Sequence, residues 1–220
     1  MNTLLVNFKN YPEVFGEGSL RLAAAVMEAT EARDVDAIVA PPIPMISLVA
    51  SKVEVQVYSQ SVGPGTGDKT TGEILPEAVQ ASGASGTILN HSESRQSAPV
   101  IQKLVPRLLQ LGLGTCLCSK DVDEAVSFAG LGTRYLAIEP PELIGTGIAV
   151  SKARPELIQE SVSALRKAGY HGKILCGAGI VSGEDVARAV ELGADGILVA
   201  SSVVKAKDWG AKLRELASSL

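Results

Sequence analysis

The sequence predicts an α/β fold, a closed (β/α)8 barrel that occupies residues 1–220 as a single domain. Short runs rich in Val, Ile and Leu alternate with helix-like segments, and no linker or low-complexity segment separates them. Alternation of this kind indicates a parallel sheet with helical crossovers that cover both faces of the strands. An open doubly wound sheet fits the same pattern, but its usual Gly-rich turn after the first strand is replaced by "NFKNYPE". We therefore favour the barrel.

The elements follow from apolar runs and from capping signals. The helix-like segment 154–169 has Pro155 in its first turn and Gly169 at its end, and Pro106 is predicted to kink or split the segment 97–112. The stretch 120–134 is too short for a full-length fifth helix. Further helices are expected at 19–34, 182–193 and 208–220. The predicted strands are residues 3–9, 37–42, 53–60, 86–92, 114–119, 134–140, 173–179 and 196–202.

Composition excludes several classes of protein. Apolar residues make up 46% of the 220-residue chain, which is typical of a globular protein. The net charge of −4 and the scarcity of aromatic residues argue against a nucleic-acid surface. We also expect no membrane segment, and a cytoplasmic location. Cys116, Cys118 and Cys176 lie in apolar runs, so we interpret them as buried packing thiols, although the first two share a strand face and could in principle hold a metal.

The first predicted strand places polar side chains in the mouth of the barrel. Because alternate residues of a strand point to opposite sides, Val6 and Phe8 are expected to face the helices, while Asn7 and Lys9 face inward. A lysine at the carboxyl end of a buried strand loses hydration unless it meets an anion there. The alternative is that the long aliphatic stem of Lys9 carries its ammonium group out to solvent.

Two further strands end on groups that can move protons. The fourth ends in His91, with Glu93 two residues on, and the sixth ends in Glu139. His171 precedes the seventh strand, so it should lie at the opposite face of the barrel. Lys9, His91 and Glu139 together supply a cation, an imidazole and a carboxylate, which are the groups needed to move a proton beside a carbonyl.

Small residues follow the last three strands, in "IGTG" (144–147), "CGAGI" (176–180) and "VASS" (199–202). Backbone N–H groups in such loops can hold a phosphate without any arginine. The predicted substrate-binding residues are Asn7, Lys9, Ile144, Gly145, Gly177, Ala178, Gly179, Ala200 and Ser201.

Taken together, these residues resemble the triosephosphate isomerase family, and the resemblance runs nearly from end to end of the chain. "NFKN" resembles the family's Asn-x-Lys opening, and "NHSE" its Gly/Asn-His-Ser-Glu motif. "EPPELIGTG" resembles its lid, and "QSVGPGTGDKTTGEI" (60–74) its third loop. The compact chain resembles the shorter archaeal branch of the family. The resemblance implies a (β/α)8 TIM barrel that interconverts dihydroxyacetone phosphate and D-glyceraldehyde 3-phosphate in glycolysis and gluconeogenesis.

The resemblance also implies a role for each residue. Glu139 is the base that moves a proton between two substrate carbons, and His91 is the neutral electrophile at the carbonyl oxygen. Lys9 offsets the developing negative charge. Asn7 has a positioning role, and Glu93 pairs with Lys9. The substrate is a small phosphorylated triose, and no metal or other cofactor takes part.

The lid and the assembly are implied in the same way. Pro140 and Pro141 restrict one hinge of the lid, while Gly145 and Gly147 free the other. In this family the loop that corresponds to 61–72 inserts into a neighbouring subunit, which implies a homodimer or a homotetramer.

The sequence departs from the family pattern at two places. The family's Tyr-Gly-Gly-Ser-Val is "CGAGI" (176–180) here, so the tyrosine's contact with the closed lid is lost. Its Gly-Gly after the eighth strand is Ala200-Ser201.

Three other functions remain open on the sequence alone. A different phosphate-binding barrel would need another acid–base pair or a metal site, and the two histidines of the chain argue against a histidine-rich metal centre. A Schiff-base aldolase would need Lys9 free of carboxylate partners, which Glu93 argues against. A catalytically silent phosphosugar-binding barrel would not need Glu139 or His91.

Overall fold

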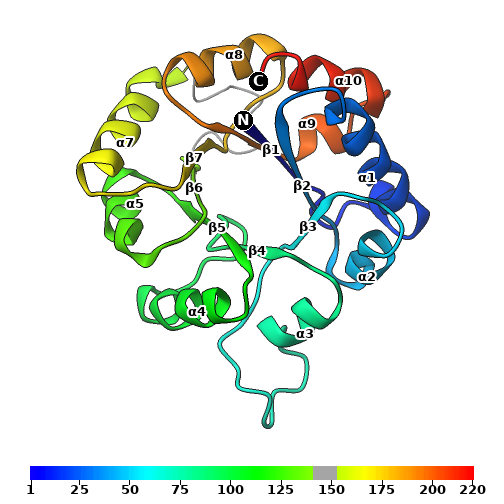
Figure 1. The fold of residues 1–220 in the computed structure, drawn as a ribbon, viewed down its shortest axis with the longest axis vertical. Coiled ribbons are helices and arrows are strands. Elements are labelled where there is room, and N and C mark those ends of the chain that lie inside the picture. The colour runs from blue at the N-terminus through cyan, green and yellow to red at the C-terminus, as the bar shows by residue number, and fades with distance from the viewer. Residues whose placement is uncertain (141–152) are drawn as a thin grey trace.

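The residues described by the computed structural model, 1–140 and 153–220, form a closed barrel of parallel strands in the order β1 to β8 (Figure 1). Each strand pairs with its neighbour in the sequence, and β1 closes the ring against β8. The predicted barrel is therefore confirmed and the open sheet is excluded. The strands are β1 Asn2–Asn7, β2 Val35–Ala40, β3 Gln56–Ser59, β4 Gly86–Leu89, β5 Gly114–Ser119, β6 Tyr135–Ile138, β7 Lys173–Cys176 and β8 Gly196–Val199.

Helices surround the strands, as Figure 1 shows. The described helices are α1 Glu17–Thr30, α2 Ile46–Ala50, α3 Pro76–Ala81, α4 Ala98–Gln110, α5 Val122–Phe128, α7 Pro155–Lys167, α8 Gly183–Glu191, α9 Ser201–Val204 and α10 Trp209–Ala217. Short 3-10 turns lie at Pro12–Val14, Ile43–Met45 and Ala129–Leu131. As predicted, the fifth helix is short. None of the described helices is long and apolar enough to cross a membrane.

Pro106 is predicted to kink or to split its segment. The prediction of a split is wrong, because α4 runs continuously from Ala98 to Gln110. Proline removes the N–H that would donate to the carbonyl of Gln102, one turn earlier. Both Gln102 and Pro106 are exposed, so water can satisfy that carbonyl without ending the helix. Leu104, Val105 and Leu108 hold the other face of α4 in the core.

Seven of the eight predicted strands end one to three residues earlier than expected, and in two of them the cause is a residue in the left-handed region. The first ends at Asn7 and the fourth at Leu89, although the apolar runs predicted residues 9 and 92 as their ends. Lys9 has φ +49° and Asn90 has φ +60°, and a strand cannot continue through the left-handed region. The chain therefore turns at these residues and delivers their neighbours to the mouth of the barrel.

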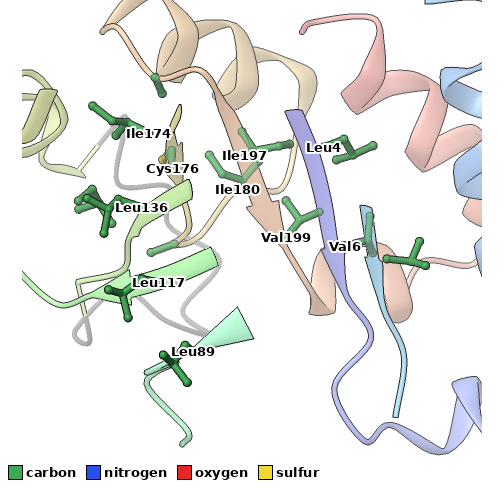
Figure 2. Close-up of a cluster of buried hydrophobic side chains, with 14 of the residues drawn as sticks. Leu4, Val6, Leu89, Leu117, Leu136, Ile174, Cys176, Ile180, Ile197 and Val199 are labelled. Carbon is green, nitrogen blue, oxygen red and sulfur yellow. The ribbon is translucent and has the colours of Figure 1, made fainter. Parts of the chain in front are cut away.

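Strand residues divide between two hydrophobic layers. Inward side chains such as Leu5, Cys116 and Cys118 fill the barrel, whereas outward side chains such as Val6 and Phe8 pack against the helices. This alternation confirms the predicted orientation of the first strand. Ten members of the outer layer are labelled in Figure 2: Leu4, Val6, Leu89, Leu117, Leu136, Ile174, Cys176, Ile180, Ile197 and Val199.

The thiols pack as predicted. Cys116, Cys118 and Cys176 are buried, and none of them forms a disulfide. The described residues contain no cluster of His, Cys, Asp and Glu that could hold a metal ion.

A polar network around the buried Asp36 closes the end of the barrel opposite the carboxyl ends of the strands. The hydroxyl of Tyr135 donates to Asp36 Oδ2 at 2.7 Å, and Lys173 Nζ and Arg134 Nη2 lie 3.5 and 3.3 Å from the same oxygen. Gln56 donates to Asp36 Oδ1. One carboxylate thus satisfies donors from three strands.

We expect Asp36→Ala to lower stability without lowering activity. The substitution leaves the buried Tyr135 hydroxyl without its acceptor, a loss of about 1–3 kcal/mol. For a chain of this size we expect Tm to fall by about 2–4 °C per kcal/mol. Thermal unfolding and turnover measure the two effects, with the exposed Asp34→Ala on the same face as the control. A variant that lost turnover but kept its Tm would contradict this assignment.

Candidate active site

Two adjoining cavities open at the carboxyl ends of the strands, and Lys9, Tyr11 and His91 line both. The first has a volume of about 390 Å³ and also contains Asn7 and Glu93. The second is bounded by these predicted residues: Glu139, Gly177, Ala178, Gly179, Ala200 and Ser201. The structure thus brings together every predicted site residue except Ile144 and Gly145, which lie outside the described residues. His171, as expected, is exposed at the other face, in the turn before β7.

Lys9 is held in the mouth by bonds to its backbone. Its N–H donates to Asn7 Oδ1 at 2.9 Å, and its carbonyl accepts from Gln60 Nε2 at 2.8 Å. Gln60 also donates to the carbonyl of Ala40, so one amide joins the ends of the first three strands. These bonds maintain the left-handed backbone of Lys9, which an unsupported lysine would rarely adopt. The ammonium group lies 2.7 Å from Glu93 Oε1.

His91 is buried and its tautomer follows from its contacts. The backbone N–H of Glu93 donates to His91 Nδ1 at 3.2 Å. A protonated imidazole carries a hydrogen on both nitrogens, so Nδ1 can accept this bond only in the neutral ring. The proton of the neutral ring then resides on Nε2, which lies 3.5 Å from Glu139 Oε1. A neutral N–H donor therefore stands beside a carboxylate.

Glu139 is a buried carboxylate, with 3% of the residue exposed. Its backbone N–H donates to the carbonyl of Ser119, which continues the pairing of β5 and β6 by one residue. Burial raises the pKa of Glu139 above that of an exposed glutamate, while the charge that His91 carries when it is protonated, the Cys118 thiol and the charge of Lys9 act in the opposite direction. Its Oε2 atom has no hydrogen-bond partner among the residues that the structure describes. That oxygen is free to accept a proton.

The absence of a side chain at Gly177 leaves space for the side chain of Glu139. A Cβ atom at Gly177 would lie 2.6 Å from Glu139 Cγ, closer than real Cβ contacts. We expect Gly177→Ala to displace the carboxylate and to lower kcat by roughly 10- to 100-fold, because reacting groups must be placed to within about 1 Å. Steady-state kinetics test this, with Gly130→Ala as the control, since a Cβ there meets no described atom within 4 Å. Unchanged kcat in Gly177→Ala would show that the glutamate tolerates the crowding.

The segments after β7 and β8 offer backbone donors. Gly179 has φ +70°, a conformation that suits glycine, and turns the chain between β7 and α8. In α9 the N–H of Val204 donates to the carbonyl of Ala200. The N–H groups of Ser201 and Ser202 therefore precede the first such bond of the helix, and neither donates to another residue that the structure describes, so both can bind an anion.

Sequence reasoning missed several residues that line the cavities, notably Tyr11, Gln60 and Ser202. Gln60 could have been found, because it directly follows β3 at the same end of the sheet as Lys9. Tyr11 lies in the loop after β1, where no periodic pattern places a side chain. Lys205 Nζ lies 4.4 Å from the centroid of the Tyr11 ring, which ties this loop to the segment after α9.

Comparisons with known proteins show the family of this chain. A sequence model of the family described as "Triosephosphate isomerase" matches residues 2–217. A protein named triosephosphate isomerase from Caldivirga maquilingensis is 43% identical over 99% of this chain and 96% of its own length. Proteins of the same name from Methanocaldococcus jannaschii and Cenarchaeum symbiosum are 39% and 45% identical, and each match covers 97% of the relative. The chain belongs to the triosephosphate isomerase family.

Proposed function

We propose that this protein interconverts dihydroxyacetone phosphate and D-glyceraldehyde 3-phosphate, the activity that gives its family its name, through an enediolate intermediate. One observation carries the proposal. A buried carboxylate and a neutral imidazole meet at the mouth of the barrel, with Glu139 Oε1 3.5 Å from His91 Nε2. A carbon-bound proton can be removed at neutral pH only when the oxygen that gains charge is stabilised as the charge forms, and this pair provides a base and a donor.

Glu139 is the base in this proposal. Its carboxylate takes the proton from C2 of glyceraldehyde 3-phosphate and returns it to C1, which yields dihydroxyacetone phosphate. The raised pKa of Glu139 makes its ionised carboxylate a stronger base. The partnerless Oε2 atom supports this role, because no described group competes for it.

His91 and Lys9 stabilise the intermediate. His91 donates from Nε2 to the substrate carbonyl oxygen and recovers a proton from the neighbouring hydroxyl as the enediolate rearranges. Lys9 places a cation beside both oxygens and the phosphate, which lowers the energy of the negative charge in a partly desolvated cavity. Asn7 positions Lys9 through its bond to the Lys9 N–H, and Glu93 holds the ammonium group from the side.

The phosphate binds to backbone N–H groups after β7 and β8 in this proposal. Gly177, Ala178 and Gly179 lie on one side of the second cavity and Ala200 and Ser201 on the other. These short loops lack cationic side chains, so the phosphate charge is met by peptide dipoles and by Lys9. Ile144 and Gly145, together with Pro141 and Gly147 of the lid, lie outside the described residues, and their part in binding stays a prediction.

Burial of Glu139 has a consequence for stability. A group whose pKa is raised in the folded state stabilises the fold when protonated, and this contribution is lost as pH rises through the folded pKa. We expect Glu139→Gln, which carries no charge, to raise Tm above that of the wild type at pH 8. The gain should shrink towards zero below the unfolded pKa of about 4.3, where both side chains are neutral.

Thermal unfolding at several pH values between these limits measures that gain, with the exposed Glu156→Gln as the control. A Tm difference that does not depend on pH would show that the charge of Glu139 is not the cause.

We further propose that residues 1–220 fold as one domain, that the protein is cytoplasmic, and that it forms a homodimer or a homotetramer. The segment between β3 and α3 supports the assembly, because it projects away from the barrel (Figure 1). Its base is fixed by bonds from Gly63 N to the Ile74 carbonyl and from Gly65 N to Glu73 Oε1. A projecting segment with a rigid base is suited to insertion into a second subunit. Light scattering after size-exclusion chromatography gives the oligomeric state.

The activity is tested with the purified chain in the presence of a chelator. We expect fast conversion of D-glyceraldehyde 3-phosphate and very slow conversion of D-glyceraldehyde, because the phosphate supplies binding energy that the reaction uses. The Schiff-base alternative is tested in the same samples by borohydride trapping, which should leave Lys9 unmodified. Equal rates for the two substrates, or no conversion of either, would overturn the proposal.

A further inference from the structure

Asn90, which precedes His91, has an unusual environment for a residue outside the cavities. It is 1% exposed, it directly follows β4, and its backbone lies in the left-handed region with φ +60°. Asparagine tolerates this region better than most residues, but glycine tolerates it best. The backbone conformation alone therefore does not require an asparagine here.

The side chain of Asn90 has partners for both of its polar atoms. Its Nδ2 donates to the carbonyl of Cys118 at 2.9 Å, and its Oδ1 accepts from the N–H of Gln96 at 3.0 Å. A carbonyl can only accept and a backbone N–H can only donate, so these partners fix the orientation of the amide. The carbonyl of Asn90 itself accepts from Arg95 Nη1 at 3.1 Å. The residue before His91 is thus fixed on three sides.

The contact with Cys118 crosses from β4 to β5 at the point where β4 ends. Leu89 of β4 pairs with Leu117 of β5, and β5 continues to Ser119 while β4 stops. The Asn90 amide therefore supplies a donor to a buried carbonyl that has lost its neighbouring strand. A glycine at position 90 would keep the turn but remove this donor.

Cys118 also affects the other half of the catalytic pair. Its thiol is among the groups that lower the pKa of Glu139, while its carbonyl is bound by Asn90. Arg95, which binds the carbonyl of Asn90, adds its charge near the same carboxylate and pairs with Glu124 of α5. The bond between Asn90 and Cys118 therefore joins the turn that carries His91 to a residue that affects Glu139.

We propose that Asn90 is a positioning residue, whose side-chain bond to the Cys118 carbonyl sets the placement of the His91 imidazole against the Glu139 carboxylate. Asn90 is not among the described residues that line the two cavities, so it acts through its neighbours rather than on the substrate. This inference rests on the proposed isomerase function for its effect on turnover. Its effect on the imidazole can be measured without turnover.

The test uses two variants that tolerate a positive φ. Asn90→Gly keeps the turn and removes the whole amide, whereas Asn90→Asp keeps the shape but replaces the donor with an oxygen that faces the Cys118 carbonyl. In both we expect kcat to fall by roughly 10- to 100-fold, as is typical of a misplacement of about 1 Å, with KM changed less than about threefold. The control is Asn2→Gly, which removes an amide that donates to the backbone carbonyl of Leu220. We expect that variant to keep the wild-type kcat.

The second readout is nitrogen NMR of the imidazole. The chain has two histidines, so selective labelling gives one set of signals for His91 and one for His171, which serves as an internal reference. We expect the Asn90 variants to shift the His91 signals in the free protein and to leave those of His171 in place. Wild-type kcat together with unmoved His91 signals in a folded variant would overturn the inference.

The two proposals can fail separately. No turnover by the wild type overturns the proposed function, while the His91 signals still decide whether Asn90 positions the ring. An active wild type whose Asn90→Gly and Asn90→Asp variants match it in both readouts overturns only the inference. If one variant fails to fold, the other decides the outcome by the same two readouts.

Discussion

Glu139→Gln is expected to lower kcat by roughly a thousandfold or more while the protein still binds phosphate esters. General base catalysis contributes about 10²- to 10⁴-fold, and glutamine cannot accept the carbon-bound proton. The cavity around the side chain keeps its shape, because the amide matches the carboxylate in size. Steady-state kinetics give kcat, and calorimetric titration with glycerol phosphate, which cannot react, gives the affinity.

Two companion variants sharpen this test. Glu139→Asp keeps the charge but withdraws the carboxylate by one methylene, so we expect roughly a hundredfold loss of kcat. Glu156→Gln, at an exposed position of α7, should have no effect on kcat. A Glu139→Gln protein that isomerises at the wild-type rate would remove Glu139 from the mechanism, whatever its effect on binding.

Lys9→Met is expected to lower kcat/KM by roughly 10²- to 10³-fold, the loss that follows removal of one preorganised group from a developing oxyanion. Lys9 is the cation whose ammonium group lies in the mouth, held by Glu93, and methionine preserves most of its length without the charge. Because Lys9 is proposed to contact the phosphate as well as the intermediate, we expect KM to rise as kcat falls. Initial-rate kinetics over a wide range of substrate concentration separate the two constants.

A matched variant isolates the role of the charge at position 9. Lys103→Met makes the same substitution at an exposed position of α4 and should leave both constants unchanged. Addition of a primary alkylammonium ion should restore part of the activity of the shorter variant Lys9→Ala, because truncation of the side chain leaves space for a small cation. A Lys9→Met protein with wild-type kcat/KM would mean that peptide dipoles alone stabilise the intermediate.

The sequence predicted the barrel because its signals are local. Each strand is a short apolar run, and helices such as α7 and α8 carry their own start signals, so no knowledge of distant contacts was needed. The shortest helices, α2 and α9, carry no periodic signal, because they span hardly more than one turn. The continuity of α4 through Pro106 depends on solvent exposure, which the sequence does not show.

The candidate site likewise has residues that the sequence predicts and contacts that it does not. Asn7, Lys9, His91 and Glu139 could be predicted because parallel strands bring their carboxyl ends to one place. The contacts that hold these residues are long-range, for example from Gln60 to the Lys9 carbonyl and from Asn90 to the Cys118 carbonyl. Such bonds follow from the register of neighbouring strands and from left-handed turns, neither of which a periodic pattern encodes. The part of the chain that orients the catalytic groups is therefore visible only in the structure.

The measurement that tests the central claim most directly is proton NMR of the reaction run in D2O, with the wild-type chain, D-glyceraldehyde 3-phosphate and a chelator. Proton transfer through an enediolate predicts dihydroxyacetone phosphate of which a fraction carries a single deuterium at C1, because the proton on Glu139 can exchange with solvent before it returns. Product formed without deuterium at C1 would indicate a direct shift of hydrogen between the carbons. That result, or the absence of any product, would contradict the account.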